Sequence, residues 1–291
     1  MSMSAYGQLP VPRLTPELLG LIKTGRVYSL GVDFEEGMLT PGAAMKSYSI
    51  APHLRHSDPS TINPGSAAAE TIRMSIHVGT HIDALCHIAE KRDEAGNPDP
   101  DGTPYLYDGP GKLIPASECV SSAGQRHLSI EEMPPIVTRG VLLDIAAYKD
   151  VDMLPPAYQV DADDIAGAIE RQGAVMSENT AVLVRTGSIQ LLRDGDPIYR
   201  DAQTGLNLEA AQFLVERGMN LVGADNMAVE AMPPHDHSVH RFLLVHSGIT
   251  HVENLNLDEL AAANCYEFLL IIAPLKLTGA TGSWVNPIAI A

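Results

Sequence analysis

Four side chains with metal-binding or proton-transfer chemistry fall within one short segment, at His77, His81, Asp83 and His87. Imidazole nitrogens and a carboxylate are the ligands that Zn²⁺, Mn²⁺ or Fe²⁺ bind in proteins. On an extended strand, positions 77, 79, 81 and 83 all point the same way, and Gly79 leaves open space between the ligands. The segment therefore predicts half of a metal site on one face of a strand.

His87 lies four residues beyond Asp83, and a continuing strand would carry it out of reach of the other three side chains. The chain must therefore turn, and we expect residues 83–90 to form the first turns of a helix that returns His87 to the site. In such a helix Cys86 points away from His87, so we interpret Cys86 as a packing residue.

A second set of ligands is needed, and residues 235–253 are the richest source of candidates. We expect His240, early in a helix over residues 238–247, to converge with Glu253 at the end of the following strand. His251 shares strand parity with Glu253 and is an alternative ligand. His235 and His237 are close to the Pro233-Pro234 pair. For these two, exposed loop positions are at least as good an interpretation as a role at the rim of the site.

The elements that must position these residues alternate between strands and helices from residue 138 onward, which is typical of α/β architecture. Caps and stops mark the clearest helix, from Asp161 to Gln172 with Gly173 as its end. The other predicted helices cover 15–25, 207–217, 238–247 and 258–263. The predicted strands cover 27–32, 140–145, 181–185, 220–223, 249–252, 266–272 and 284–290. We expect a single domain over 1–291, with an irregular N-terminal region 1–70, an irregular stretch at 35–70, and an exposed charged loop at 90–111.

Composition restricts the class of protein. The 291 residues carry a formal net charge of −17, which disfavours phosphate backbones and anionic membrane surfaces as partners. The three cysteines form no CxxC pair, so neither a disulfide framework nor a thiolate zinc site is supported. The longest apolar run, Phe268 to Pro274, is too short to span a bilayer, and no signal peptide is visible. We expect a cytoplasmic enzyme that acts on a small molecule.

The pattern His-x-Gly-Thr-His-x-Asp-x-x-x-His from His77 to His87 resembles the signature of the cyclase family of metal-dependent hydrolases. That family includes bacterial kynurenine formamidase, isatin hydrolase and trans-dienelactone hydrolase. The segment His240-Arg241-Phe242-Leu243-Leu244, with Glu253-Asn254-Leu255 after it, resembles the family's second ligand stretch. Gly223-Ala224-Asp225 with Glu230, and Arg185-Thr186-Gly187, are also similar to its longer members, so the resemblance covers most of residues 70–290.

The resemblance implies a fold and a site. The fold would be a mixed β-sheet with a barrel-like core and surrounding helices, the swivelling β/β/α type. His77, His81 and Asp83 would bind a first Zn²⁺ or Mn²⁺ ion, and Asp83 would bridge to a second ion held by His240 and Glu253, if two are bound. His87 would be the catalytic histidine. The reaction would be hydrolysis of a cyclic amide, a lactone or an N-formyl amide, in an enzyme expected to be a homo-oligomer.

Two other functions fit parts of the pattern. His81, Asp83 and His240 imitate the 2-His-1-carboxylate triad of mononuclear Fe(II) oxygenases, although those enzymes usually have all-β folds. A non-catalytic metal-binding protein of the same fold would not need His87. The sequence contains no Gly-x-Ser-x-Gly motif, so a serine hydrolase is not supported. It also contains neither a P-loop nor a Rossmann Gly-x-Gly-x-x-Gly motif, so a nucleotide site is not supported. Arg185 could hold a substrate carboxylate, but an ordinary ion pair is the more frequent role.

Overall fold

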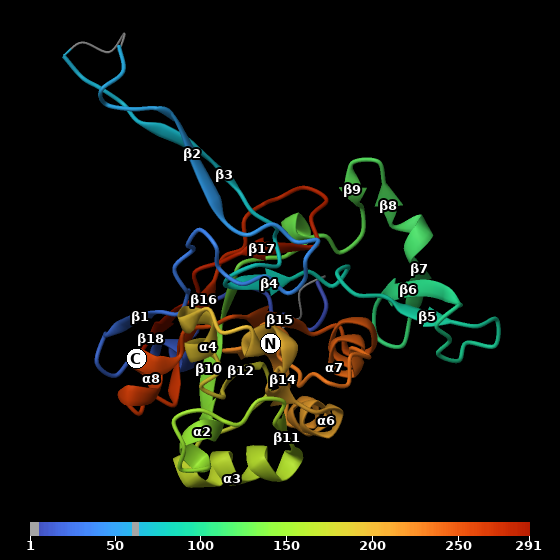
Figure 1. Ribbon diagram of the computed structural model, residues 1–291. Helices are drawn as coiled ribbons and strands as arrows, with labels where there is room; N and C mark the ends of the chain where they lie inside the picture. The colour runs from blue at the N-terminus through green and yellow to red at the C-terminus, as the bar shows by residue number, and fades with distance from the viewer. Residues whose placement is uncertain (1–5, 60–63) are drawn as a thin grey trace.

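The protein is described here by a computed structural model that covers residues 6–59 and 64–291 (Figure 1). A nine-stranded mixed sheet forms its centre and curls into a half-barrel. This confirms the predicted α/β fold with a barrel-like core. In sheet order its strands are β1 (Val27–Ser29), β18 (Ile288–Ile290), β16 (Glu267–Ile272), β10 (Ile136–Asp144), β12 (Thr180–Arg185), β14 (Met219–Ala224), β15 (Thr250–Glu253), β4 (His81–Asp83) and β17 (Gly282–Trp284).

The four central strands β10, β12, β14 and β15 run parallel, and the strands on either side of them are antiparallel. Alternate residues of the central strands face opposite sides, so the sheet carries a core on each face. Val141, Leu143 and Val182 face one core, which α3 (Ala162–Gln172) and α6 (Leu208–Glu216) cover. Leu142 and Leu183 face the other core, inside the curl.

Helix α3 agrees with its prediction at both ends. The Asp161 side chain accepts a hydrogen bond from the Asp164 N–H at 2.9 Å, and Gly173 ends the helix in the left-handed conformation. The remaining helices are short: α1 (Pro16–Leu19), α2 (Ile145–Tyr148), α4 (Ile189–Asp194), α5 (Ile198–Asp201), α7 (Ser238–His240), α8 (Asp258–Ala262) and the 3₁₀ turns η1 (Ala116–Glu118) and η2 (Ile130–Glu132). No helix of the described chain is both long and apolar enough to cross a membrane.

Several predicted boundaries were wrong. Helix α1 ends at Leu19 rather than near Gly25, and the predicted helix 238–247 is a short α-helix followed by the π-helix η3 (Arg241–Ser247). The predicted strand 284–290 is two strands, because Asn286 and Pro287 interrupt it. Its first half is in β17 at one edge of the sheet, and its second half is β18, between β1 and β16 at the other end.

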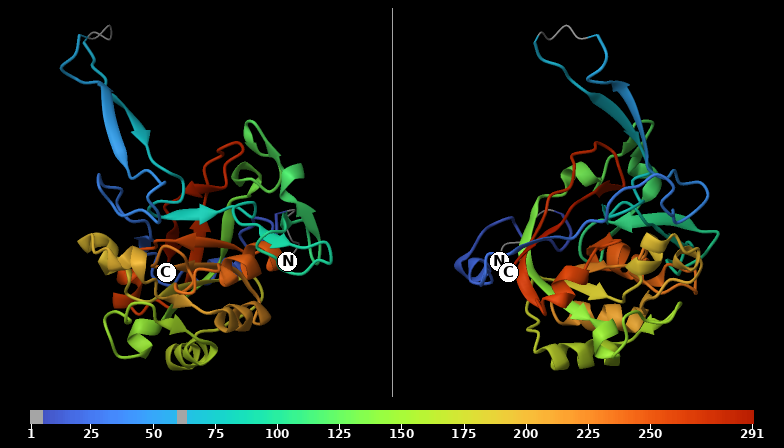
Figure 2. Two further views of the ribbon diagram at one scale, coloured as in Figure 1. Left: turned by 45° about the vertical axis from the view of Figure 1, so that its right-hand side comes forward. Right: turned by 60° about the vertical axis from the view of Figure 1, so that its left-hand side comes forward.

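The two segments predicted to be irregular contain strands. In the 35–70 stretch, β2 (Ser49–Leu54) pairs with β3 (Ala69–Arg73) to form a hairpin. In the 90–111 loop, β5 (Glu90–Arg92) and β6 (Thr103–Tyr107) pair with each other, and β7 (Leu113–Pro115) extends them into a small sheet. Two small pairs, β8 (Val120–Ser121) with β9 (Gly124–Gln125) and β11 (Gln159–Val160) with β13 (Gly205–Leu206), complete the strands. Figure 2 shows both hairpin regions projecting from the body of the molecule.

Candidate metal centre

Two neighbouring antiparallel strands bring together ligand-type side chains from distant parts of the sequence. In the pairing of β4 with β15, His81 lies opposite Glu253. Asp83 is two residues from His81 and His251 is two residues from Glu253, so all four side chains share one face of the sheet. His81 Nε2 lies 3.3 Å from Glu253 Oε2, and His251 Nε2 lies 2.9 Å from Asp83 Oδ2. All four residues are buried.

His77 reaches the cluster from a turn rather than from the strand that was predicted to begin with it. The strand β4 begins at His81 and ends at Asp83. Gly79, just before it, adopts a φ of +68°, so the extended conformation does not continue back to His77. His77 Nδ1 nevertheless lies 2.8 Å from Asp83 Oδ1. His77 Nε2 shares a hydrogen bond of 2.9 Å with Thr281 Oγ1, which leaves Nδ1 free to face the cluster.

His87 also reaches the cluster without the predicted helix. Residues 84–87 form a tight turn closed by the His87 N–H donating to the Ala84 carbonyl at 2.9 Å, and the chain then enters β5. The His87 ring stacks on the His77 ring with centroids 3.8 Å apart, and its Nε2 lies 3.7 Å from Asp83 Oδ2. Cys86 packs in the core, as predicted.

His240 joins the cluster from α7, so the predicted convergence with Glu253 is present in the structure. His240 Nε2 lies 3.4 Å from Glu253 Oε1. Its Nδ1 donates to Glu230 Oε1, and Glu230 Oε2 accepts the Val239 N–H at 3.0 Å. A carboxylate behind a histidine fixes which ring nitrogen carries the proton and directs the other nitrogen toward a metal.

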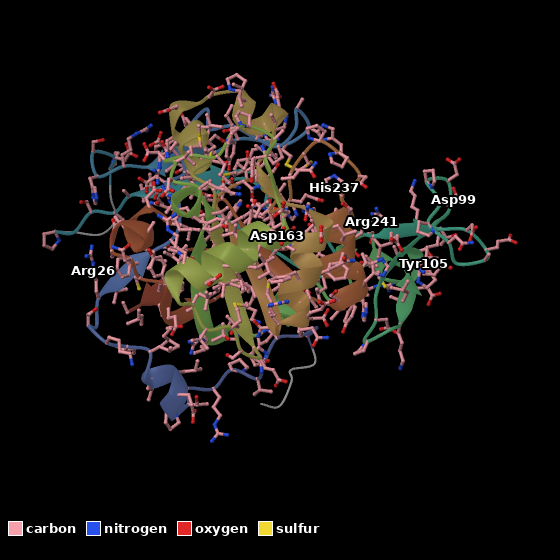
Figure 3. The ribbon with its side chains drawn as sticks, turned by 90° about the horizontal axis from the view of Figure 1, so that it is seen from below. Arg26, Asp99, Tyr105, Asp163, His237 and Arg241 are labelled. Atoms are coloured by element: carbon pink, nitrogen blue, oxygen red, sulfur yellow. The ribbon has the colours of Figure 1, made fainter. Side chains whose placement is uncertain are left out.

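The remaining candidates lie outside the cluster. His235 is exposed, and His237 is partly exposed with its Nδ1 3.4 Å from Glu230 Oε1. Figure 3 shows His237 beside Arg241, near the segment of β5 and β6 where Asp99 and Tyr105 lie. Arg185 is held between Asp144 and Asp258, each 3.1 Å away, so it forms ion pairs.

Sequence reasoning gave His251 only as an alternative and did not assign Glu230 a role. Strand parity with Glu253 was the available signal for His251. Glu230 was named only as part of the resemblance, because its contact with His240 depends on the turn that precedes α7.

The charges of the cluster are strongly coupled. Burial acts to raise the pKa of Asp83, but His87, His77 and His251 outweigh it and hold that pKa well below its ordinary value. Burial opposes the charged form of His81 and His240, yet the carboxylates around them raise their pKa to about 9 and about 10 respectively. Burial lowers the pKa of His87 to about 3, so this imidazole is neutral. The carboxylates are therefore ionised and His87 is uncharged.

The donor set fits a divalent cation. Several buried nitrogen and oxygen atoms of the cluster lie within ligand range of each other but make no hydrogen bond of acceptable geometry. They are His77 Nδ1, His81 Nε2, both Asp83 carboxylate oxygens and His251 Nε2. Unsatisfied polar atoms are costly when buried, and a cation at their point of convergence would satisfy them. Asp83 belongs to two overlapping groups, one with His77 and His87 and one with His240, His251 and Glu253.

Gly79 is required by its surroundings, which gives a first prediction. A Cβ at Gly79 would lie 2.3 Å from the Phe34 ring, whereas a Cβ at Gly25, with a similar φ of +71°, would meet nothing within 4 Å. Both alanine variants should lose about 1–2 kcal/mol from the left-handed backbone. Gly79→Ala should lose about 1–3 kcal/mol more through overpacking, and it should weaken metal binding by displacing His77 and His81. Urea unfolding and metal titration measure both effects, and equal losses in the two variants would contradict this account.

Glu230 gives a second prediction. Glu230→Gln should keep the fold but lower metal affinity about 10–100-fold, because the amide no longer holds His240 as the carboxylate does. Glu209→Gln, on the exposed side of α6, removes the same charge and should leave affinity unchanged. Competition with a chromophoric chelator measures the affinities, and equal values for both variants would exclude this role for Glu230.

The curled mixed sheet and the buried His/Asp/Glu cluster define the class, an α/β protein with a candidate metal centre on its sheet. The family model described as putative cyclase matches residues 28–231. The chain belongs to that family. The match includes His77–His87 and ends before His240, so part of the cluster lies beyond it.

Similar proteins agree with the family. Kynurenine formamidase of Bacillus mycoides (strain KBAB4) is 28% identical over 228 residues, covering 78% of this chain and 81% of the relative. A crystal structure of a novel cyclase is 28% identical with a TM-score of 0.81, covering 96% and 94% of the two chains. Isatin hydrolase A from Labrenzia aggregata, bound to benzyl benzoate, shares the fold at 22% identity, with a TM-score of 0.62 and coverage of 91% and 93%. Together these relatives support a metal-dependent hydrolase of this family.

Proposed function

We propose that this protein is a metal-dependent hydrolase that cleaves a cyclic amide, a lactone or an N-formyl amide of a small aromatic molecule. The observation that carries the proposal is the buried cluster in which ligand-type atoms from β4, β15, α7 and the turn at His77 converge, several of those on β4, β15 and the turn without a hydrogen bond. The relatives named as kynurenine formamidase and isatin hydrolase support the class of bond.

The ligands are assigned by their positions. His77, His81 and Asp83 hold one side of the centre, and His240 and Glu253 hold the other. His251 is added to the ligands because its Nε2 faces Asp83 and Glu253. Zn²⁺ or Mn²⁺ suits this nitrogen and oxygen set, and the two groups sharing Asp83 accommodate one or two ions. Such an ion lowers the pKa of a coordinated water to about 7 and polarises a carbonyl group.

His87 is proposed as the proton-transfer residue because of its exposure and its position beside Asp83. Its side chain is 23% exposed, whereas those of His81 and Asp83 are each 1% exposed, so substrate reaches the cluster from the side of His87. Its Nε2 atom, 3.7 Å from Asp83 Oδ2, is positioned to accept a proton during attack and to return it to the leaving nitrogen or oxygen.

An aromatic group beside the cluster supports a planar substrate. Phe34 packs against Gly79, and the rings of Tyr48 and Trp284 lie 6.3 and 6.4 Å from the Phe34 ring. All three rings are partly exposed. The chain has one tryptophan and four phenylalanines, so this group contains its one tryptophan and one of its four phenylalanines. Partly exposed aromatic faces can stack on an aromatic substrate and exclude water from the reacting bond.

The proposal is tested by measuring hydrolysis after loading the protein with Zn²⁺ or Mn²⁺. The panel contains a fused aromatic cyclic amide, an N-formyl arylamine and an aryl lactone, each beside its non-aromatic analogue. We expect turnover of at least one aromatic substrate that a chelator abolishes and added metal restores. Metal-loaded protein that is inert on the whole panel would refute the proposal. Oxygen consumption with Fe(II) would instead indicate an oxygenase that uses His81, Asp83 and His240.

A further inference from the structure

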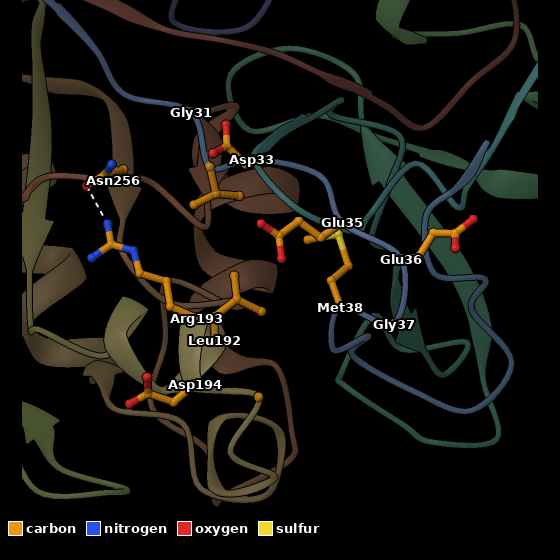
Figure 4. Close-up of a pocket in the computed structure, with 12 residues that line it drawn as sticks. Gly31, Asp33, Glu35, Glu36, Gly37, Met38, Leu192, Arg193, Asp194 and Asn256 are labelled. Atoms are coloured by element: carbon orange, nitrogen blue, oxygen red, sulfur yellow. Dashed lines mark hydrogen bonds between the residues drawn. The ribbon is translucent and has the colours of Figure 1, made fainter. Parts of the chain in front are cut away.

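A buried carboxylate lies between two segments that lead to opposite sides of the candidate centre. Glu90 is the first residue of β5, three residues after His87, and it is 3% exposed. A glutamate is almost never fully buried unless it is paired. The carboxylates on the walls of the cavity of about 480 Å³ shown in Figure 4 are, by contrast, exposed: Asp33, Glu35, Glu36 and Asp194. The burial of Glu90 therefore needs a cause of its own.

Three nitrogen-bearing side chains surround Glu90. Its Oε2 accepts a hydrogen bond from Arg92 Nε at 2.7 Å. Its Oε1 accepts one from Arg241 Nη1 at 2.9 Å and lies 3.0 Å from His246 Nε2. Burial acts to raise the pKa of Glu90, but His246 and Arg92 outweigh it and hold that pKa below its ordinary value. Arg241 and His246 both belong to η3, so the ionised carboxylate ties β5 to that helix.

Arg241 extends this tie to the His240 side of the centre. It follows His240 directly in the chain. Its backbone N–H donates to the His237 carbonyl at 2.9 Å, and its Nε donates to the Asp236 carbonyl at 3.2 Å. A fixed Arg241 side chain therefore fixes the turn that leads into α7, and the contact with Glu90 fixes Arg241.

The other end of the tie lies on the His87 side. Glu90 pairs with Tyr105 of β6, and Figure 3 shows Arg241 close to the segment that carries Tyr105. Only Ile88 and Ala89 separate Glu90 from His87, and both pack against the core. Glu90 therefore limits where the His87 turn can lie. The single contact between Glu90 and Arg241 spans the two sides of the centre.

Stability alone does not explain this arrangement. The ring of Tyr107 on β6 lies 2.4 Å from where a Cβ at Gly248 would be, so the small sheet packs against the end of η3 without Glu90. Buried ion pairs add little net stability relative to apolar side chains, but they can select one geometry. His87 needs such a constraint, because its Nε2 lies 3.7 Å from Asp83 Oδ2, which is longer than a hydrogen bond.

We propose that Glu90 is a positioning residue that sets the separation of His87 and His240 across the candidate centre. It acts through Arg241 on one side and through β5 on the other. The role rests on the proposed function where turnover is measured, whereas a metal spectrum reports it through binding alone. A displacement of about 1 Å in such a site can cost about 100-fold in rate, so loss of the Glu90 charge should be visible in both.

Glu90→Gln tests the proposal with Co²⁺ as the metal probe, because the visible absorption of Co²⁺ reports the number and geometry of its ligands. The absorption bands should shift, and the dissociation constant for Co²⁺ should rise about 10-fold as His240 is held less firmly. On a substrate that the wild-type protein hydrolyses, kcat should fall about 10–100-fold while KM changes less. The midpoint of urea unfolding should also fall, which a purely structural role would produce by itself.

Asp164→Asn is the matched control. Asp164 is also 3% exposed, accepts a hydrogen bond from the Tyr158 hydroxyl at 2.8 Å and pairs with Lys149. It lies on α3, away from β5 in Figures 1 and 2. This variant should lower the urea midpoint and leave the Co²⁺ spectrum and kcat unchanged. A wild-type spectrum and kcat in Glu90→Gln, or equal changes in both variants, would overturn the proposal.

Arg241→Gln keeps the test decisive if Glu90→Gln fails to fold. It leaves Arg92 and His246 on the carboxylate and removes only the contact that leads to His240. The spectral shift and the loss of kcat should recur in this variant, and their absence would overturn the proposal. Wild-type protein that binds Co²⁺ but hydrolyses nothing would refute the proposed function, and the spectra would still decide the role of Glu90. Wild-type protein that binds no Co²⁺ would overturn both.

Discussion

Asp83→Asn is expected to abolish metal binding and to lower the hydrolysis rate on the order of 10³-fold. Asp83 is the residue shared by the two ligand groups, and its oxygens face His77 on one side and His251 on the other. The amide of asparagine removes the negative charge and one oxygen, so both groups lose a ligand. Elemental analysis of the purified variant measures bound metal, and the substrate panel measures the rate.

A surface pair provides the control for this prediction. Asp108 lies 3.2 Å from His127 on the exposed surface, so Asp108→Asn removes the same charge from another Asp–His pair. That variant should retain full metal content and activity. Normal metal content in Asp83→Asn would show that the cluster binds its ion without this carboxylate, and the assignment of the centre would then be wrong.

His87→Ala is expected to keep its metal and to lose about 10²–10⁴-fold in kcat, the usual contribution of a positioned acid–base group. The ring is at the open side of the cluster, 3.7 Å from Asp83 Oδ2, and the contacts of Glu253 with His81 and His251 do not involve it. The affinity for substrate should change less than kcat, because the lost interaction belongs to the transition state.

Metal content decides between two roles for His87. His235→Ala is the control, since it removes an exposed imidazole five residues before His240. If His87→Ala loses metal in proportion to its activity, His87 is a ligand in the group with His77 and Asp83. If it turns over at the wild-type rate, His87 has neither role.

Local sequence signals predicted the parts of the fold that local interactions decide. The helix α3 was placed correctly because Asp161 satisfies the free N–H groups at its start and Gly173 adopts the left-handed conformation at its end. The alternation of central strands and helices was also visible, because the strands are buried on both faces and therefore uniformly apolar.

Long-range pairing decided what the sequence could not predict. The segment 284–290 has the composition of one strand, but Trp284 pairs with His81 and Ile288–Ile290 pair with β16 and β1 at the other side of the sheet. The hairpin of β2 and β3 was missed because residues 35–70 have weak periodicity and many small, polar and proline residues, and its pairing joins segments separated along the chain.

The identities of the site residues were more predictable than the backbone that carries them. Residue type and spacing selected His77, His81, Asp83, His87, His240 and Glu253, and the structure brings these six side chains together. The expected continuous strand and helix were wrong, because the Phe34 ring and the left-handed Gly79 impose a turn on one side of β4. A further turn at residues 84–87 brings His87 back on the other side.

The pairing of β4 with β15 has a consequence for synthesis of the protein. His81 and Asp83 leave the ribosome long before His240, His251 and Glu253, and within residues 6–59 and 64–291 β4 has β15 and β17 as its neighbours in the sheet. A nascent chain therefore carries half of the centre on a strand without a partner until synthesis has passed β15 at Glu253. Acquisition of the proposed metal would then follow the synthesis of β15, and chains released before it would offer an unpaired β4 to other molecules.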